Sequence, residues 1–405
     1  FTVGGFVTIV SSYSRFTSAD PVNGAATLPG TYIKVSSGGN TGVVQVVGYT
    51  NATTVTGQVV AVLPGASPIT VGSAAGTSFE MSAWNGREGW PRTVTIFEQR
   101  MYFGGNTLNP DTIWASRVGN YGDMMEIPFQ QDPDFSTFSA DNSRPWSAAI
   151  SISSQSYQIQ SMAAAKTLEI HTTKSDIVAY GGSGNTLGPL NKVFESTTSF
   201  GSEPIQPVRV NNYSTFVQRG GRKIRDTVFN FNEDQYKSSD LIFMADHLTY
   251  NDPVKRLASS EFLTTSLLMA VTQTGRLIAC AIDRDYKVNA WHEWTFRSLF
   301  GVRVIDVVVI PQAGDYNEDV IYIFVARTLS GGVPSYQLLR VRKIFEGDEY
   351  EFYDSSDDQM HYMDFIKSGT NATSPTANAQ VTGLSAFNGE TVSVIGDSYY
   401  LGDFE

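Results

Sequence analysis

The histidines of this chain are the first candidates for metal binding or acid–base chemistry. There are four of them, His171, His247, His292 and His361, and no two have the close spacing of a metal-binding motif. The single cysteine does not complete a ligand set. His292 lies between two tryptophans in Trp291-His292-Glu293-Trp294, a pattern that favours packing at a strand edge. The histidines therefore predict no metal site.

Two further segments resemble ligand-binding loops but lack key residues. Asp315 to Asp319 resembles the start of an EF-hand calcium loop, yet Val320 stands where that loop needs glycine, and Ala326 where it needs glutamate. A solvated turn is the favoured interpretation, with adventitious cation binding as the alternative. Gly182 to Gly188 is rich in glycine but lacks the Lys-Ser/Thr pair and the helix of a phosphate-binding loop. It is predicted to be a plain loop.

Nucleophilic and glycosidic chemistry also lack a signal. The sequence contains no G-x-S-x-G nucleophile elbow and no S-x-D-x-G-x-x-W box of the kind found in propeller glycosidases. Aspartate and glutamate are plentiful, so that any two of them would make an uninformative catalytic pair. We therefore predict no catalytic, cofactor-binding or metal-binding residue and no cofactor, and we expect that the protein is not an enzyme.

Charge is distributed unevenly along an acidic chain. The formal net charge is −12, which argues against general nucleic-acid binding because phosphate contacts need an excess of Lys and Arg. Arg219 to Arg225 nevertheless places four cations around one predicted hairpin tip. This tip is either a solvated turn or a contact for an acidic neighbour or passing DNA. Glu346 to Asp358 has seven acids and no base, and it is either simply exposed or a repulsive surface facing DNA.

The elements that position these residues are predicted to be almost entirely strands. Short alternating apolar runs with turn residues between them fill residues 30–62, which favours a small barrel or sheet. Further hairpins follow from about residue 90. Their predicted turns are Glu98-Gln99, Gly220-Gly221 as a type I′ turn, and Gln273-Thr274-Gly275. Successive groups of three or four antiparallel strands are typical of propeller blades.

Helix is expected to be scarce, and composition gives few other constraints. The best helix candidate is Asp240 to Leu248, with Ser238 or Ser239 as N-cap. Only 17% of the 405 residues are charged, against roughly 25% in ordinary soluble domains, which suits a protein that hides surface in an assembly. Cys280 lies in an apolar run and is predicted to be a buried small hydrophobe. The sequence contains no run of about 18 apolar residues, so no membrane-spanning helix is predicted.

One ordered set of motifs carries a resemblance to a known family. Its central part is Gln99-Arg100-Met101-Tyr102-Phe103-Gly104-Gly105, preceded by Gly89-Trp90-Pro91 and followed by Asn109-Pro110, Thr112-Ile113-Trp114-Ala115-Ser116, Gly119 and Tyr121. Further motifs follow in the same order within residues 161–201, 236–248, 275–294 and 383–397. Over about residues 85–400 the chain resembles the tail nozzle proteins of short-tailed bacteriophages, also called tail tubular protein B or tail hub proteins.

The chain departs from the family pattern in two places. The family usually has a basic or polar residue where Ala386-Phe387-Asn388 stands, and residues 129–146 look locally inserted. We expect these departures to affect which neighbouring tail proteins are contacted.

The resemblance implies a structural virion protein of the phage tail. It implies a homo-hexameric ring that extends the DNA conduit below the portal adaptor protein, supports DNA ejection, and carries tail fibre, spike or needle proteins. Double-stranded DNA would pass through its lumen without sequence-specific binding. The alternative function is a carbohydrate-binding or carbohydrate-cleaving β-propeller that recognises the host envelope.

The predicted fold is all-β, a β-propeller-like array of antiparallel sheets with an additional small β-barrel or β-sheet domain. We expect an N-terminal arm or the end of a preceding domain over residues 1–29, a small β domain over 30–63 and a linker over 64–87. The propeller is expected over 88–345, and an acidic segment with a C-terminal β segment over 346–405. We also expect that the numbering starts inside a longer polypeptide, which continues past residue 405.

The charge balance leads to one hypothesis about the conduit. A cationic wall would hold DNA through phosphate contacts, whereas an acidic wall would let the duplex slide. We therefore hypothesise that the inner surface of the ring is predominantly acidic, with outward-facing acids that serve only solubility as the alternative.

Overall fold

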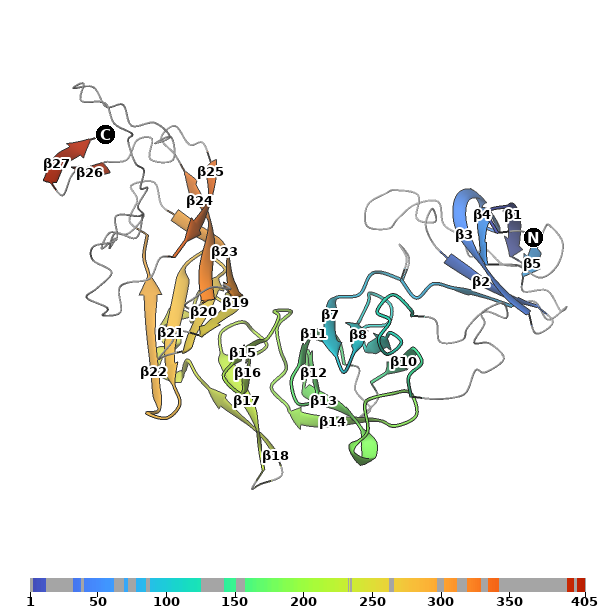
Figure 1. Ribbon diagram of the computed structural model, residues 1–405, viewed down its shortest axis with the longest axis horizontal. Helices are drawn as coiled ribbons and strands as arrows, with labels where there is room; N and C mark the ends of the chain where they lie inside the picture. The colour runs from blue at the N-terminus through green and yellow to red at the C-terminus, as the bar shows by residue number, and fades with distance from the viewer. Residues whose placement is uncertain are drawn as a thin grey trace. The chain divides into compact units, whose positions relative to one another are not determined.

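The computed structural model describes most of the chain between its ends. The described residues are 3–11, 32–37, 40–61, 69–71, 78–84, 88–124, 142–150, 157–231, 233, 235–261, 266–296, 302–311, 319–328, 334–341, 392–396 and 399–404. The chain divides into two compact units, Phe1–Pro204 and Ile205–Glu405, and we describe each by itself. Strands dominate both units (Figure 1).

The first sheet of the first unit has six strands in the order β5-β1-β4-β3-β2-β6. Its strands are β1 (Phe6–Ser11), β2 (Tyr32–Ser37), β3 (Asn40–Asn51), β4 (Thr54–Ala61), β5 (Ile69–Val71) and β6 (Ser78–Met81). All neighbours pair antiparallel except β1 and β5, which are parallel. Alternate valines and isoleucines, among them Ile9, Ile33 and Val44, are fully buried in its core. The sheet is larger than the predicted small domain, because β1, β5 and β6 come from the segments expected to be an arm and a linker.

Two four-stranded sheets complete the described part of the first unit. The first contains β7 (Thr93–Phe97), β8 (Arg100–Gly104), β9 (Thr112–Ala115) and β10 (Trp146–Ala149), and the second contains β11 (Ile159–Ala164), β12 (Leu168–Thr172), β13 (Asp176–Gly181) and β14 (Lys192–Thr198). Each sheet is an antiparallel meander in chain order. The first strand of the second sheet, β11, contacts β7 and β8 of the first.

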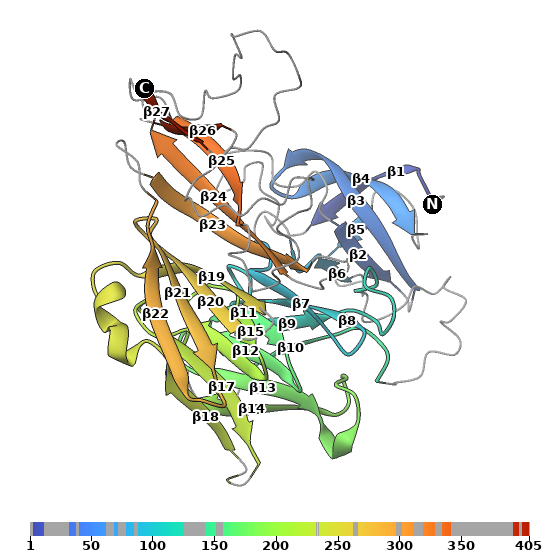
Figure 2. The ribbon, with the colours of Figure 1, turned by 60° about the vertical axis from the view of Figure 1, so that its left-hand side comes forward.

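The second unit repeats this arrangement with two four-stranded meanders and one three-stranded meander. They are β15 (Val208–Val210), β16 (Tyr213–Val217), β17 (Ile224–Asn230) and β18 (Gln235–Asp240); β19 (Val254–Glu261), β20 (Ser266–Thr272), β21 (Leu277–Asp283) and β22 (Val288–Trp294); and β23 (Val302–Pro311), β24 (Asp319–Thr328) and β25 (Pro334–Arg340). A two-stranded sheet of β26 (Val392–Gly396) and β27 (Tyr399–Phe404) follows. The leading strand β19 contacts both β15 and β23, and Figures 1 and 2 show the β19–β22 and β23–β25 sheets side by side.

The fold class predicted from the sequence is confirmed. The protein is all-β, with propeller-like arrays of antiparallel meanders and an additional β-sheet domain. Within each unit, contact between the leading strands of consecutive sheets is the arrangement of propeller blades. The described residues contain two short 3₁₀ segments, η2 (Gly182–Gly184) and η3 (Phe243–Leu248), as their helical elements.

Burial follows the order of strands within a blade. Every residue of β20 is buried and β21 is nearly so, whereas the outer strand β22 is mostly exposed. A middle strand covered on both faces reads as a continuous apolar run, because neither face can be polar. Cys280 on β21 is fully buried, as predicted, and burial raises the pKa of its thiol to about 12.

The predicted hairpins form, with one turn closed at a different position. Glu98 and Gln99 both have positive φ and join β7 to β8, as expected for a type I′ turn. Gly220 and Gly221 also have positive φ. The amide of Gly221, however, donates to the carbonyl of Gln218 at 3.0 Å, which places Arg219 and Gly220 at the centre of that turn. Since only the second of these has positive φ, the turn is type II rather than type I′.

The predicted helix is shorter than expected. Its proposed start, residues 238–240, belongs to β18, and the helical segment is the 3₁₀ turn η3 with Ile242 at its N-cap position and no side-chain cap. Ala245 and Leu248 are buried, whereas Met244 is 89% exposed. Within the described residues, no helix has the length and apolar character needed to cross a bilayer.

We predict that shortening a buried side chain on a middle strand destabilises the second unit strongly. Leu268 on β20 is fully buried, so Leu268→Ala removes transfer free energy and leaves a cavity, at a cost of about 2–5 kcal/mol. Leu338 on β25 is 66% exposed, and Leu338→Ala is the matched control, with an expected cost below about 1 kcal/mol. Urea unfolding followed by tryptophan fluorescence measures both. Equal losses would show that middle-strand burial does not dominate stability.

Candidate functional site

The sequence predicted no catalytic, cofactor-binding or metal-binding residues. The histidines lie in different surroundings. His171 is buried on β12, His247 lies exposed in η3, and His361 is outside the described residues. His292 is exposed on β22, where its Nε2 accepts a hydrogen bond from Trp294 Nε1 at 2.7 Å. The described part of the chain contains no group of three or more His, Cys, Asp or Glu side chains that could hold a metal ion.

The two loop-like segments differ in how much of them is described. Most of Asp315 to Asp319 lies outside the described residues, and Asp319 at its end accepts a hydrogen bond from the Glu261 amide at 2.8 Å. Gly182 to Gly188 is a single 3₁₀ turn followed by extended backbone, with no helix after it. The predicted loop is therefore present.

The residues of the central family-like motif form one buried hub around Arg100. The Arg100 side chain is 1% exposed although it carries a charge. Its Nη1 donates to the carbonyls of Ser116 at 2.5 Å and Arg144 at 2.8 Å, and its Nη2 donates to the carbonyl of Asn142. One guanidinium thus satisfies three backbone acceptors from two different loops. Its planar fork of donors suits this role, which a lysine could not fill.

Ser116 extends the hub to the next strands. Its Oγ accepts from the Met101 amide at 3.0 Å and donates to the Arg117 carbonyl at 3.1 Å. The Glu98 carboxylate in the adjacent turn accepts from the Leu187 amide at 2.6 Å. These bonds all connect the motif to backbone rather than to a cavity. The motif therefore holds the first blade-type sheet to its flanking loops.

Aromatic side chains of the motif pack around the same sheet. Trp84 lies with its ring centroid 4.5 Å from that of Phe103 and 5.7 Å from that of Trp114, the latter edge-on. Tyr102 contacts Trp146 in an edge-on arrangement at 5.9 Å. Edge-to-face pairs of this kind stabilise a core beyond the area they bury. Of the two matched tryptophans, Trp114 is accordingly a core residue, whereas Trp90 is 68% exposed.

A second polar cluster is buried where β12, β13 and the end of β14 meet the loop that follows β14. His171 Nδ1 lies 2.8 Å from Asp176 Oδ1, and Ser202 Oγ donates to the same carboxylate oxygen at 2.8 Å. The Thr198 hydroxyl donates to Asp176 Oδ2. Glu169 Oε2 lies 3.8 Å from His171 Nε2, beyond hydrogen-bond distance, so it acts through its charge. Sequence reasoning missed this cluster; its only sign was polar residues within an apolar hairpin.

The cluster contains the residue types of a Ser-His-Asp triad but not its geometry. A nucleophilic serine bonds the imidazole nitrogen opposite the aspartate. Here Ser202 Oγ lies 3.4 Å from Nδ1, the nitrogen that already contacts Asp176. Ser202, His171 and Asp176 are each at most 3% exposed, so substrate has no access to them. The cluster therefore clamps neighbouring strands together.

Electrostatics keep the imidazole of this clamp charged. Burial lowers the pKa of His171, but the carboxylates of Asp176 and Glu169 outweigh burial and raise that pKa to about 9. For Asp176, burial acts in the opposite direction and raises the pKa. The hydrogen bonds with His171, Thr198 and Ser202 outweigh burial and hold the pKa of Asp176 below its usual value. The pair is thus ionised near neutral pH.

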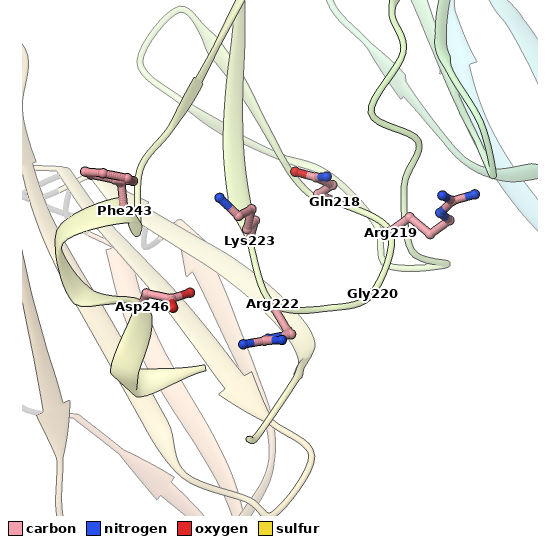
Figure 3. Close-up of a pocket in the computed structure, with 7 residues that line it drawn as sticks. All are labelled: Gln218, Arg219, Gly220, Arg222, Lys223, Phe243 and Asp246. Carbon is pink, nitrogen blue, oxygen red and sulfur yellow. The ribbon is translucent and has the colours of Figure 1, made fainter. Parts of the chain in front are cut away.

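The cations of the predicted hairpin line a surface hollow in the second unit. The hollow has a volume of about 420 Å³ and is lined by Gln218, Arg219, Gly220, Arg222, Lys223, Phe243 and Asp246. Figure 3 shows Arg222 and Lys223 on the side of the hairpin that faces η3, with Phe243 and Asp246 across from them and Arg219 directed away. We call Arg219, Arg222, Lys223 and Phe243 the hairpin surface.

Backbone contacts hold the hairpin in place. The Gly221 carbonyl accepts from the Val254 amide at 2.7 Å, which ties the tip to β19. A Cβ on Gly221 would lie 2.7 Å from Pro253 Cβ, and its φ is +72°, so only glycine fits. The arginines and lysine are therefore displayed from a fixed support.

Lys223 and Arg222 of the hairpin surface contact residues of the same unit. Lys223 Nζ lies 2.6 Å from Asp240 Oδ2, and the Arg222 guanidinium stacks over the Tyr250 ring at 4.1 Å. Arg222 Nε is shielded from solvent and has no hydrogen-bond partner among the described residues. Arg284 Nε and Tyr102 Oη are shielded and lack a partner in the same way, so it is the excess of cations on one face, not this atom, that attracts an anion. The surface is thus suited to an anionic ligand.

The acidic run Glu346 to Asp358 lies outside the described residues, as does most of the segment after β25. The hypothesis of an acidic lumen, which depends on that run, stays a prediction.

Comparisons with known proteins give little similarity. No protein-family model matches the chain, and no curated protein matches it. One solved structure with a match is a crystal structure of a protein from Lactobacillus plantarum. It is 9% identical over 76% of this chain and 82% of that chain, with a TM-score of 0.34. That similarity is too low to support an argument about function.

We predict that Arg100 is a major stabilising residue of the first unit. Arg100→Met keeps an apolar stem of similar length but leaves the carbonyls of Ser116, Asn142 and Arg144 without these donors. The expected loss is about 3 kcal/mol or more, because each buried unsatisfied group costs about 1–3 kcal/mol.

Arg92→Met is the matched control, since Arg92 is exposed and donates to the Gln160 side chain at 3.0 Å. Urea unfolding should show a loss below about 1 kcal/mol for this variant. Comparable losses in both variants would contradict the assignment of Arg100 as the hub.

We further predict a pH-dependent stability that originates at His171. Its folded-state pKa of about 9 lies above the ordinary histidine pKa of 6.5. The stabilisation is therefore complete below about pH 6.5 and is lost as pH rises through 9. Its magnitude is about 3 kcal/mol. The difference in unfolding free energy between wild type and His171→Gln, measured from pH 6 to 10, should shrink across this window.

His247→Gln provides the control, because His247 is exposed in η3. Its difference from wild type should stay constant over the same pH range. A constant difference for His171→Gln as well would show that the buried imidazole is neutral in the folded state.

Proposed function

We propose that this chain is a structural virion protein, the protomer of a tail nozzle or tail hub ring of a short-tailed bacteriophage. In this role it extends the DNA conduit below the portal adaptor protein and carries fibre, spike or needle proteins. The single observation that supports this most is the use of the family-like motif. Its Arg100, Ser116 and Trp114 build one hub of the propeller-like scaffold.

The architecture is compatible with this role. Within each unit, consecutive antiparallel meanders touch through their leading strands and leave outer strands and loops available for contacts. The proposed function needs such an arrangement and needs no reaction. We accordingly propose that the protein is not an enzyme and that DNA passes it without sequence-specific binding.

Exposed apolar side chains also support an assembled protein. Val308 and Ile310 on β23, Phe324 on β24, and Tyr336 and Leu338 on β25 are between 37% and 66% exposed. The strand register pairs Phe324 with Leu338, and the Phe324 and Tyr336 rings stack at 6.1 Å. Contiguous apolar surface of this kind typically marks a contact with another molecule.

The assembly state of the purified full-length chain tests the proposal. We expect mass photometry to give a hexamer of the 44.3 kDa chain, and negative-stain electron microscopy to show a ring with an axial opening. The expectation comes from the family resemblance and from the exposed apolar surface. Incubation with polysaccharide of the host envelope should release no reducing ends. A monomer or trimer that cleaves such a polysaccharide, with activity lost on replacing one Asp or Glu by Ala, would contradict the proposal.

A further inference from the structure

The hairpin surface is a local reversal of charge on an acidic protein. The chain carries a net charge of −12, yet residues 219–225 contain four Lys or Arg residues and no acid. Asp240 and Asp246 are the nearby acids that the structure places beside it. Such a reversal attracts an anionic partner, and the folded support at Gly221 keeps the cations in place for it.

Exposed apolar side chains lie beside the cations, which separates the hairpin surface from a simple phosphate-binding patch. Phe243 lines the hollow and is 70% exposed, the next residue Met244 is 89% exposed, and Tyr250 beside Arg222 is 57% exposed. Double-stranded DNA offers a backbone of phosphates and gives such side chains little to pack against. An acidic polypeptide that also carries aromatic side chains satisfies both features.

The chain itself contains a segment with this chemistry. Glu346 to Asp358 has seven acids and no base, and Tyr350, Phe352 and Tyr353 are interleaved among them. Its carboxylates are complementary in charge to the arginines and the lysine. Its aromatic rings match Phe243 and Met244.

We propose that the hairpin surface binds the acidic segment Glu346–Asp358 of a second copy of this chain. This inference rests on the proposed ring, since every copy then carries both halves of one contact. A contact between two different surfaces repeats head to tail and closes a ring when the rotation allows it. The contact gives the ring a direction.

Complementary variants test this contact in the full-length chain. The first variant, Arg219→Glu with Arg222→Gln, alters the surface and keeps the segment. The second, Glu349→Gln with Glu351→Gln and Asp354→Asn, alters the segment and keeps the surface. Each alone should associate about tenfold more weakly than wild type, since two or three charge pairs are lost. An equimolar mixture should form heterodimers, because one intact surface then meets one intact segment.

Lys287→Glu is the matched control, because Lys287 is an exposed cation in the turn between β21 and β22 of the same unit. It should associate like wild type. Raising the salt concentration from 0.05 to 0.5 M should weaken association of wild type and of the mixture, because exposed charges are screened. Far-ultraviolet circular dichroism establishes that each variant is folded, and the segment variant tests the contact independently of any damage to the hairpin.

The outcomes separate this contact from the proposed function. Rings that persist in both variants would overturn the contact and leave the nozzle proposal standing. An oligomer that depends on both halves but never closes into a ring would support the contact and contradict the nozzle. A monomeric wild type would overturn both. Double-stranded DNA binding that is abolished in the first variant, with no heterodimer in the mixture, would overturn the contact in favour of a phosphate site.

Discussion

The covering of both faces of the middle strands is the constraint on which the described structure depends. β12 and β20 are buried along their whole length, so that each of these sheets must have a packed layer on either side. Burying a large aliphatic side chain stabilises by about 1.5–3 kcal/mol, and a sheet with two apolar faces loses that stabilisation if one face is uncovered. Repeated meanders that cover one another satisfy this constraint. It accounts for the apolar run of β20, whereas one buried face of β12 carries Glu169 and His171.

Two buried polar groups add specificity to this packing. Arg100 joins the first blade-type sheet to loops at residues 116, 142 and 144, and the imidazole of His171 joins β12 to the Asp176 end of β13. Desolvating a charge is costly unless every polar atom finds a partner in good geometry. Register slips that would still bury apolar side chains would break these contacts. We infer that the hydrophobic pattern gives the layers, and that these two charges distinguish one register from the others.

Sequence reasoning predicted the repeating part of the fold because that part is local. Strand period and turn chemistry are written in neighbouring residues, and Glu98-Gln99 and Gly275 do adopt positive φ where the hairpins turn. The strands β5 and β6 were missed because short strands at the edges of a sheet depend on their partners, not on a strong pattern of their own. β1 lies inside the sheet and alternates buried Val7 and Ile9 with more exposed residues, a pattern that was present in the segment predicted to be an arm. The helix at 240 was overextended because pairing with β17 holds residues 238–240 in β18.

The candidate site residues, too, could be predicted from the sequence only where the signal is local. The four cations of the hairpin were visible as a charge run, but their partners Asp240 and Tyr250 are far enough along the chain that only the fold brings them together. The His171 clamp requires a residue from a hairpin and Ser202 from the loop after the next strand, so no spacing rule could reveal it. Arg100 and the His171–Asp176 pair find hydrogen-bond partners within their own unit, whereas the hairpin surface displays its cations beside the exposed Phe243. This combination of charge and exposed apolar surface on one face is the physical basis for the proposed contact with another polypeptide.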